Sequence, residues 1–86
     1  MQKVFYANQN LGSLLRQKRL EHGVSLKQAA ESTKIREEYI VALENSDYKT
    51  LPASVYTKGF IKNYSAFLGI NSKMTLALFR RESETE

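Results

Sequence analysis

The sequence predicts an all-α domain of five helices. Its apolar residues recur at the i, i+3, i+4 spacing of amphipathic helices, and no stretch alternates apolar and polar residues for long enough to predict a strand. Capping and turn residues separate the periodic segments, so each helix has a recognisable start or stop. With 86 residues, the chain is long enough for one domain with one small core.

The first two helices are short. The first is predicted over residues 11–19, and Gly23 ends its pattern, which rests on Leu11, Leu14 and Leu15, with Leu20 following. The second covers residues 26–32 and starts with a capping box, in which Ser25 and Gln28 satisfy each other's backbone N–H groups. Its buried side is predicted to consist of small residues and one leucine: Leu26, Ala29 and Ala30.

Three further helices follow. The third is predicted over residues 36–45, with its apolar side at Tyr39, Ile40 and Leu43, and turn residues 45–49 separate it from the next. The fourth and longest helix extends to residue 68. Pro52 is expected in its first turn, where a missing N–H costs nothing, and Gly69 in the left-handed position after its end. Asn71 or Ser72 is expected to cap the fifth helix, which extends to about Arg81.

Composition excludes several kinds of chemistry. The chain has no cysteine, which rules out disulfides, thiol catalysis and thiolate zinc sites. The single histidine, His22, is expected at the surface at the end of the first helix, without the clustered ligands that a metal needs. No nucleophile and base form a catalytic pattern, so we expect neither an enzyme nor a bound cofactor. No window approaches the ~18 apolar residues of a membrane span, and we expect a soluble, cytosolic chain.

Charge is distributed unevenly along the chain, which has a net charge of +4. Residues 36–47 are acidic, whereas residues 49–81 contain lysine and arginine but no acid. This last stretch predicts a positive face that attracts an acidic surface of protein, phosphate or lipid. We expect residues 1–9 to be a flexible segment, residues 10–81 to form the domain, and residues 82–86 to be an acidic tail or the start of a linker.

The fourth helix carries more aromatic surface than one core seam needs. Its large apolar residues spread over an arc of about 140°, with Lys58, Lys62 and Ser65 on the opposite side. Several packed helices would bury the part with Tyr64, Leu68 and Ile61, whereas Tyr56 and Phe60 lie at the edge of the arc. Gly59 is unfavourable inside a helix, and either the close approach of another backbone or the crossing of an internal helix would explain it.

The second and third helices, joined by a tight turn, form a helix-turn-helix and resemble the phage-repressor-like DNA-binding family. The resemblance implies that the start of the third helix reaches DNA, and we list as DNA-binding candidates Lys27, Gln28, Lys34, Arg36, Glu37 and Tyr39. Glu37 and Glu38 weaken this interpretation, because carboxylates are unfavourable near phosphates. A glutamate can also accept a hydrogen bond from cytosine, so a DNA-binding regulator stays open as the alternative.

A longer pattern is more specific. The run Val55-Tyr56-Thr57-Lys58-Gly59-Phe60-Ile61-Lys62-Asn63-Tyr64, together with Leu51-Pro52 and Leu68-Gly69, resembles the N-terminal domain of the RodZ family over about residues 10–80. The resemblance implies a cytoplasmic adaptor, at the inner face of the membrane, that binds the actin-like protein MreB and couples it to the cell-wall elongation machinery. The membrane segment that the family has is not in this chain.

The same resemblance implies which residues contact MreB. They are Tyr56 and Phe60, flanked by Lys58 and Lys62, with Tyr64 included more cautiously because its angle places it toward the core. A small enzyme or a toxin-antitoxin-like component is a third hypothesis, which the missing catalytic pattern disfavours.

Overall fold

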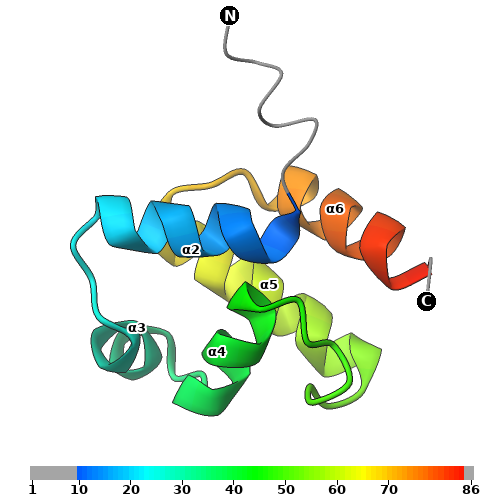
Figure 1. Ribbon diagram of the computed structural model, residues 1–86, viewed down its shortest axis with the longest axis horizontal. Coiled ribbons are helices and arrows are strands. Elements are labelled where there is room, and N and C mark those ends of the chain that lie inside the picture. Colours follow the sequence, from blue (N-terminus) through cyan, green and yellow to red (C-terminus); the bar gives the residue numbers. More distant parts are fainter. Residues whose placement is uncertain (1–9, 85–86) are drawn as a thin grey trace, which may run out of the picture.

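The computed structural model describes residues 10–84 and contains five helices over that range, as predicted (Figure 1). They are α2 (Leu11–Glu21), α3 (Leu26–Thr33), α4 (Glu37–Glu44), α5 (Ser54–Leu68) and α6 (Ser72–Glu84). Residues 1–9, which we expected to be a flexible segment, lie outside the described residues. No helix within residues 10–84 is long and apolar enough to cross a lipid bilayer.

Helix α2 is capped by Asn10, whose side-chain oxygen accepts the backbone N–H of Ser13 at 2.8 Å. Its buried side contains Leu11, Leu14 and Leu15, as the spacing predicts. Leu20 does not continue this side, because its side chain is 56% exposed. After His22, the C-cap, Gly23 adopts the left-handed conformation with φ +67°.

Helices α3 and α4 form the helix-turn-helix, and Figure 1 shows the tight turn between them. The predicted capping box is present: the Gln28 N–H donates to Ser25 Oγ at 3.0 Å, and the Ser25 N–H donates to Gln28 Oε1 at 2.9 Å. Lys34 closes α3 in the left-handed conformation with φ 64°. Ala29 is fully buried, which confirms the prediction that it belongs to the buried side of α3.

The core lies where α5 contacts the other helices. It contains residues from all five helices and from the connecting loops, and its largest fully buried side chains include Tyr64, Leu11, Leu15, Ile40, Leu43 and Ile61. Helix α5 contributes both to the core, through Ile61, Tyr64 and Leu68, and to the outer surface, through Val55 and Tyr56.

Helix α6 is longer than the sequence predicts. Asn71 accepts the N–H of Lys73 at 2.8 Å, so Asn71 caps the helix. The helix continues to Glu84, past the predicted end at Arg81. Glu82, which we assigned to a tail, accepts the Leu11 N–H at 2.7 Å and the Tyr48 O–H at 2.5 Å. Glu82 therefore packs on the folded domain, past the predicted boundary at Arg81.

Candidate protein-binding surface on α5

Helix α5 starts later than predicted. Its N-cap is Ala53, with no side-chain hydrogen bond, and Ser54 is its first residue. Pro52 therefore precedes the cap instead of lying in the first turn, and its carbonyl accepts the hydroxyl of Thr57 at 3.1 Å. Gly69 ends the helix with φ +75°, as predicted for a left-handed C-terminal glycine.

One side of α5 is buried against the rest of the domain. It contains Thr57, Ile61, Tyr64, Ser65 and Leu68. We expected Ser65 on the polar side of the helix, but it is fully buried, because α6 packs on this part of α5 and pairs the Ser65 hydroxyl with the Thr75 hydroxyl at 2.7 Å. A hydroxyl pair of this kind satisfies both polar groups and so lets them lie in a core.

The aromatic edge of α5 is exposed. Tyr56 is 62% exposed and Val55, beside it, is 70% exposed. Phe60 is half-buried, because its ring stacks on Tyr39 of α4 with 5.4 Å between centroids and 21° between planes. This contact holds Phe60 in place while part of its ring stays accessible, which gives α5 a preorganised aromatic surface.

Lys58 and Lys62 are both exposed on the flank of α5 away from Tyr56 and Phe60. Within the described part of the chain, neither lysine forms an ion pair. Their charges therefore face solvent on the other flank of α5 from the aromatic edge. We define the α5 surface as Val55, Tyr56, Lys58, Gly59, Phe60, Lys62 and Asn63.

Tyr64 does not belong to this surface. It is fully buried, and its hydroxyl donates to Glu44 Oε2 at 2.6 Å. Burial, and then the hydrogen bond to Glu44, raise the pKa of Tyr64 far above its usual value. A direct contact between Tyr64 and a partner is therefore excluded in this structure, because the side chain belongs to the core.

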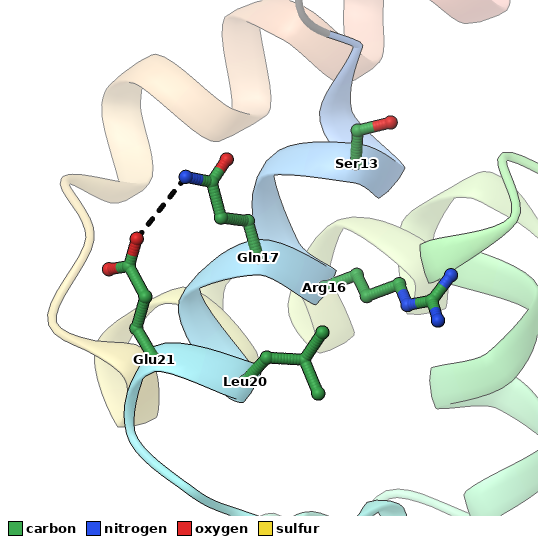
Figure 2. Close-up of a pocket in the computed structure, with 5 residues that line it drawn as sticks. All are labelled: Ser13, Arg16, Gln17, Leu20 and Glu21. Carbon is green, nitrogen blue, oxygen red and sulfur yellow. Dashed lines mark hydrogen bonds between the residues drawn. The ribbon is translucent and has the colours of Figure 1, made fainter.

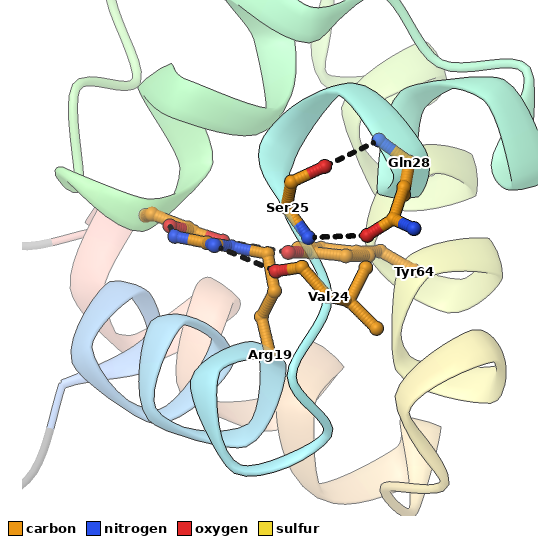
Figure 3. Close-up of polar contacts among 6 residues, drawn as sticks. Arg19, Val24, Ser25, Gln28 and Tyr64 are labelled. Atoms are coloured by element: carbon orange, nitrogen blue, oxygen red, sulfur yellow. Dashed lines mark hydrogen bonds and ion pairs between the residues drawn. The ribbon is translucent and has the colours of Figure 1, made fainter.

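Tyr64 completes a buried polar cluster (Figure 3). Arg19 donates from Nε and Nη2 to the two carboxylate oxygens of Glu44, at 2.8 and 3.0 Å, and from Nη1 to the carbonyl of Val24 at 2.9 Å. The hydrogen bond to Glu44 raises the pKa of Arg19. The cluster joins α2, α4 and α5. Because Arg19 and Glu44 are buried and paired, neither charge lies on the surface of the domain, although both count in the net charge of the sequence.

The DNA-binding candidates do not all lie together. Lys27, Lys34, Arg36 and Glu37 are exposed, and Arg36 is the N-cap of α4. The side chain of Gln28 is exposed, but its oxygen serves the capping box, as Figure 3 shows. Tyr39 points toward Phe60 of α5, so it belongs with the aromatic edge and is half-buried there.

An acidic hollow lies along α4. It is lined by Glu37, Glu38, Val41, Ala42, Asn45, Asp47 and Thr50, and Thr50 donates its hydroxyl to Asp47 at 2.7 Å. Carboxylates at this place repel the phosphate backbone of nucleic acid. The surface near the start of α4 is therefore less favourable for DNA than the net charge of the chain suggests.

A second hollow lies on α2 and includes the exposed Leu20 (Figure 2). Its lining is Ser13, Arg16, Gln17, Leu20 and Glu21, and Gln17 donates to Glu21 at 3.2 Å. All these side chains come from one helix and contain no paired nucleophile and base. Among residues 10–84 no group of acidic or histidine side chains is placed to hold a metal ion. His22 is exposed, with its Nε2 3.0 Å from the Leu68 carbonyl oxygen.

Sequence reasoning missed two features of the site. Glu44 was counted as part of an acidic segment, although it is the buried acceptor for Arg19 and Tyr64. Asn63 was noted only as part of a motif, although its side chain donates to the Thr33 carbonyl at 2.9 Å and ties α5 to the end of α3. No local pattern marks either role, because each depends on a residue at least 20 positions away.

The fold and the arrangement of α3 and α4 define a helix-turn-helix domain. The sequence profile of the family described as "Helix-turn-helix domain" matches residues 14–74. The chain belongs to this family and is of the RodZ type within it. It is 30% identical over 66 residues, 77% of its length, to the cytoskeleton protein RodZ of Streptococcus pneumoniae (strain ATCC BAA-255 / R6).

Other relatives agree with this assignment. The chain is 35% identical over 49 residues, 57% of its length, to the uncharacterized membrane protein YmfM of Bacillus subtilis (strain 168). It spans 24% of the length of the RodZ relative and 17% of the length of YmfM. These relatives are therefore much longer than the part that the chain matches.

Solved structures show the same fold. A chain from the structure described as bacterial actin MreB assembling in complex with cell shape protein RodZ is 36% identical, with a TM-score of 0.83, and the match covers 87% of this chain and 92% of that one. A structure of YmfM from Staphylococcus aureus, a candidate DNA-binding membrane protein, is 27% identical, with a TM-score of 0.80, and the match covers 86% and 90%.

Proposed function

We propose that this chain is a non-enzymatic adaptor domain that binds an MreB-type actin-like filament protein through the α5 surface. One observation carries the proposal: Tyr56 is 62% exposed and Phe60 is held beside it by Tyr39, while the other flank of α5 exposes Lys58 and Lys62, which form no ion pair within the described residues. Exposed aromatic residues that are fixed in place and bordered by positive charge are typical of the centre and rim of a protein interface.

The comparisons support this partner. The RodZ chain that shares this fold, at 36% identity, comes from an assembly with MreB. Because the relatives are cytoskeletal and membrane proteins, the proposal includes a place at the cytoplasmic face of a membrane, where the domain would connect the filament to membrane-bound cell-wall synthesis. The acid-free segment 49–81 requires an acidic area on the filament protein.

The test is a titration of isotope-labelled protein with purified MreB, followed by amide NMR shifts. We expect shifts centred on Tyr56, Lys58, Phe60 and Lys62. Tyr56→Ala is the cleanest variant, because this side chain is largely exposed and its removal should leave the fold intact. It should weaken binding by about 2 kcal/mol or more, as for a hot-spot aromatic.

Leu20→Ala is the matched control. It also removes an exposed apolar side chain, but from α2, and should leave the affinity unchanged. Lys58→Gln and Lys62→Gln should have smaller effects, mainly on the association rate. Equal losses of affinity for Tyr56→Ala, Phe60→Ala and both lysine variants would contradict the proposal. So would the absence of any amide shift on addition of MreB.

DNA binding is the second candidate function, and the description of the S. aureus YmfM structure favours it. Lys27, Lys34 and Arg36 are exposed around the start of α4 and would contact phosphates. Titration with duplex DNA at two salt concentrations tests this function. A salt-dependent response around residues 34–39 that Arg36→Gln weakens would support it, whereas no response at low salt would exclude it.

A further inference from the structure

Gly59 is a glycine that the domain itself does not require. It lies inside α5, its φ is not positive, and it is exposed. Apart from its two chain neighbours and the adjacent backbone of α5 itself, a Cβ atom added there would meet no atom within 4 Å. Glycine is nevertheless unfavourable at an interior helix position compared with alanine. Neither backbone conformation nor packing within the described residues explains its presence.

Gly12, in contrast, is a glycine that the packing of α2 against α4 requires. A Cβ atom at Gly12 would lie 2.4 Å from the carbonyl oxygen of Glu44, so only glycine lets α2 cross α4 this closely. The sequence left two explanations for Gly59, an internal helix crossing or the approach of another backbone. Within residues 10–84 no helix crosses α5 at Gly59. The other explanation, the close approach of a backbone, would then involve a second molecule.

Gly59 leaves the helix backbone bare at one position on the outer face of α5. At about 100° per residue, Gly59 lies opposite the buried Leu68. Its neighbours one turn before are Val55 and Tyr56, which are 70% and 62% exposed. One turn after it lie Lys62, which is exposed, and Asn63, which is held by its hydrogen bond to Thr33. We call this bare position, between Val55 and Tyr56 on one side and Lys62 and Asn63 on the other, the gap.

We propose that a bulky apolar side chain of the partner packs directly on the α5 backbone at Gly59, in the gap between Val55, Tyr56 and Asn63. Gly59 thereby sets how closely the partner approaches α5. An apolar group suits this place, because the helical backbone already satisfies its own hydrogen bonds and Val55 and Tyr56 expose apolar surface one turn before Gly59. The inference rests on the proposed function, since it concerns the same α5 surface.

The test uses the opposite effects that Gly59→Ala should have on stability and on binding. A methyl group at this position meets no atom of the domain, so the higher helix propensity of alanine should raise Tm by about 2–8 °C. The same methyl group occupies the gap and should weaken binding to purified MreB by about tenfold. Gly59→Gln should weaken binding further, because its side chain fills the gap.

The control is Ala77→Gln, which enlarges an exposed residue on α6 and should leave the affinity unchanged. If both Gly59 variants bind like the wild type while Tyr56→Ala binds weakly, the inference about Gly59 is wrong and the proposed function stands. If the wild type does not bind MreB, both fail. A lower Tm for Gly59→Ala would also overturn the inference, because it would mean that the fold itself requires this glycine.

Discussion

Glu44 illustrates how a single residue can organise this domain. Its carboxylate accepts two hydrogen bonds from Arg19 and one from Tyr64, and all three side chains are buried. A buried carboxylate without these donors would be strongly unfavourable. Removing either donor is therefore expected to destabilise the domain, although neither side chain is part of the α5 surface, and this separates stability from binding at the scale of single residues.

Tyr64→Phe tests the effect of this cluster on the pH dependence of stability. The pKa of Tyr64 is raised in the folded state, so the folded protein keeps the phenol proton at a pH where the unfolded chain loses it. The contribution of Tyr64 to the free energy of unfolding is complete below pH ~10, the ordinary pKa of tyrosine. Above that pH it decreases by about 1.4 kcal/mol per pH unit. Urea unfolding between pH ~9 and ~11 should show that fall for the wild type, and a smaller one for Tyr64→Phe.

Tyr56→Phe is the control for this measurement. Tyr56 is largely exposed, and the variant should have the pH dependence of the wild type. At neutral pH, Tyr64→Phe should lose about 1 kcal/mol of stability, because one hydrogen bond to a buried carboxylate is absent. Identical unfolding curves for the wild type and Tyr64→Phe at every pH would contradict the role of the hydroxyl.

At the scale of elements, the crossing of α2 and α4 depends on Gly12. Gly12 lies in the first turn of α2, where the backbone of Glu44 occupies the space that a side chain would need. The same crossing brings Arg19 to Glu44, so the close approach and the buried ion pair support each other. This element pair positions α4, and through the Tyr39 and Phe60 stack it supports the aromatic edge of α5.

We expect Gly12→Ala to destabilise the domain by about 2 kcal/mol or more, because the added methyl group would push α2 away from α4. Thermal or urea unfolding measures the loss. Ser13→Ala is the matched control on the same turn, and its exposed side chain predicts a change within about 0.5 kcal/mol. A Gly12→Ala variant as stable as the wild type would contradict this expectation, because it would show that α2 and α4 can move apart without loss of stability.

At the scale of the whole molecule, the two ends of the described chain meet. Glu82 of α6 accepts the N–H of Leu11 in the first turn of α2, a place where a carboxylate is favourable. The same carboxylate accepts the hydroxyl of Tyr48, whose ring lies edge-on to Phe79. The end of α6 therefore closes the domain over α2 and the loop before α5.

Truncation tests this closure. A chain that ends after Arg81 loses the Glu82 carboxylate and should be less stable than one that ends after Glu84, by about 1–3 kcal/mol. Both chains lack residues 85–86, so the comparison isolates residues 82–84. Equal unfolding midpoints in urea would mean that the domain ends at Arg81, as the sequence alone predicted.

The charge distribution of the whole molecule predicts how association depends on salt. With segment 49–81 free of acids and Lys58 and Lys62 unpaired within the described residues, electrostatic attraction should speed association with an acidic partner. The association rate with MreB should fall several-fold between about 50 and about 500 mM salt, and less steeply for a Lys58→Gln, Lys62→Gln double variant. A change confined to the dissociation rate would contradict this expectation.

Much of the architecture was predictable, because it depends on local signals. The capping box at Ser25, the left-handed Gly23 and Gly69, and the Asn71 cap each act within a few residues, and all are present. The predictions were wrong where contacts between residues far apart in the sequence determine whether a side chain is buried. Leu20 has the right spacing for the core but no helix covers it, and Ser65 has the polarity of a surface residue but α6 covers it.

The candidate site was predictable in part for the same reason. The sequence determined that α5 has a wide aromatic arc and a lysine flank, because helical periodicity alone places these side chains. Only the tertiary structure determined which part of the arc is exposed. Tyr64 is buried and its hydroxyl donates to Glu44, Phe60 stacks on Tyr39, and Tyr56 is exposed. Burial is set by which helices pack together, and that depends on contacts between residues far apart in the chain.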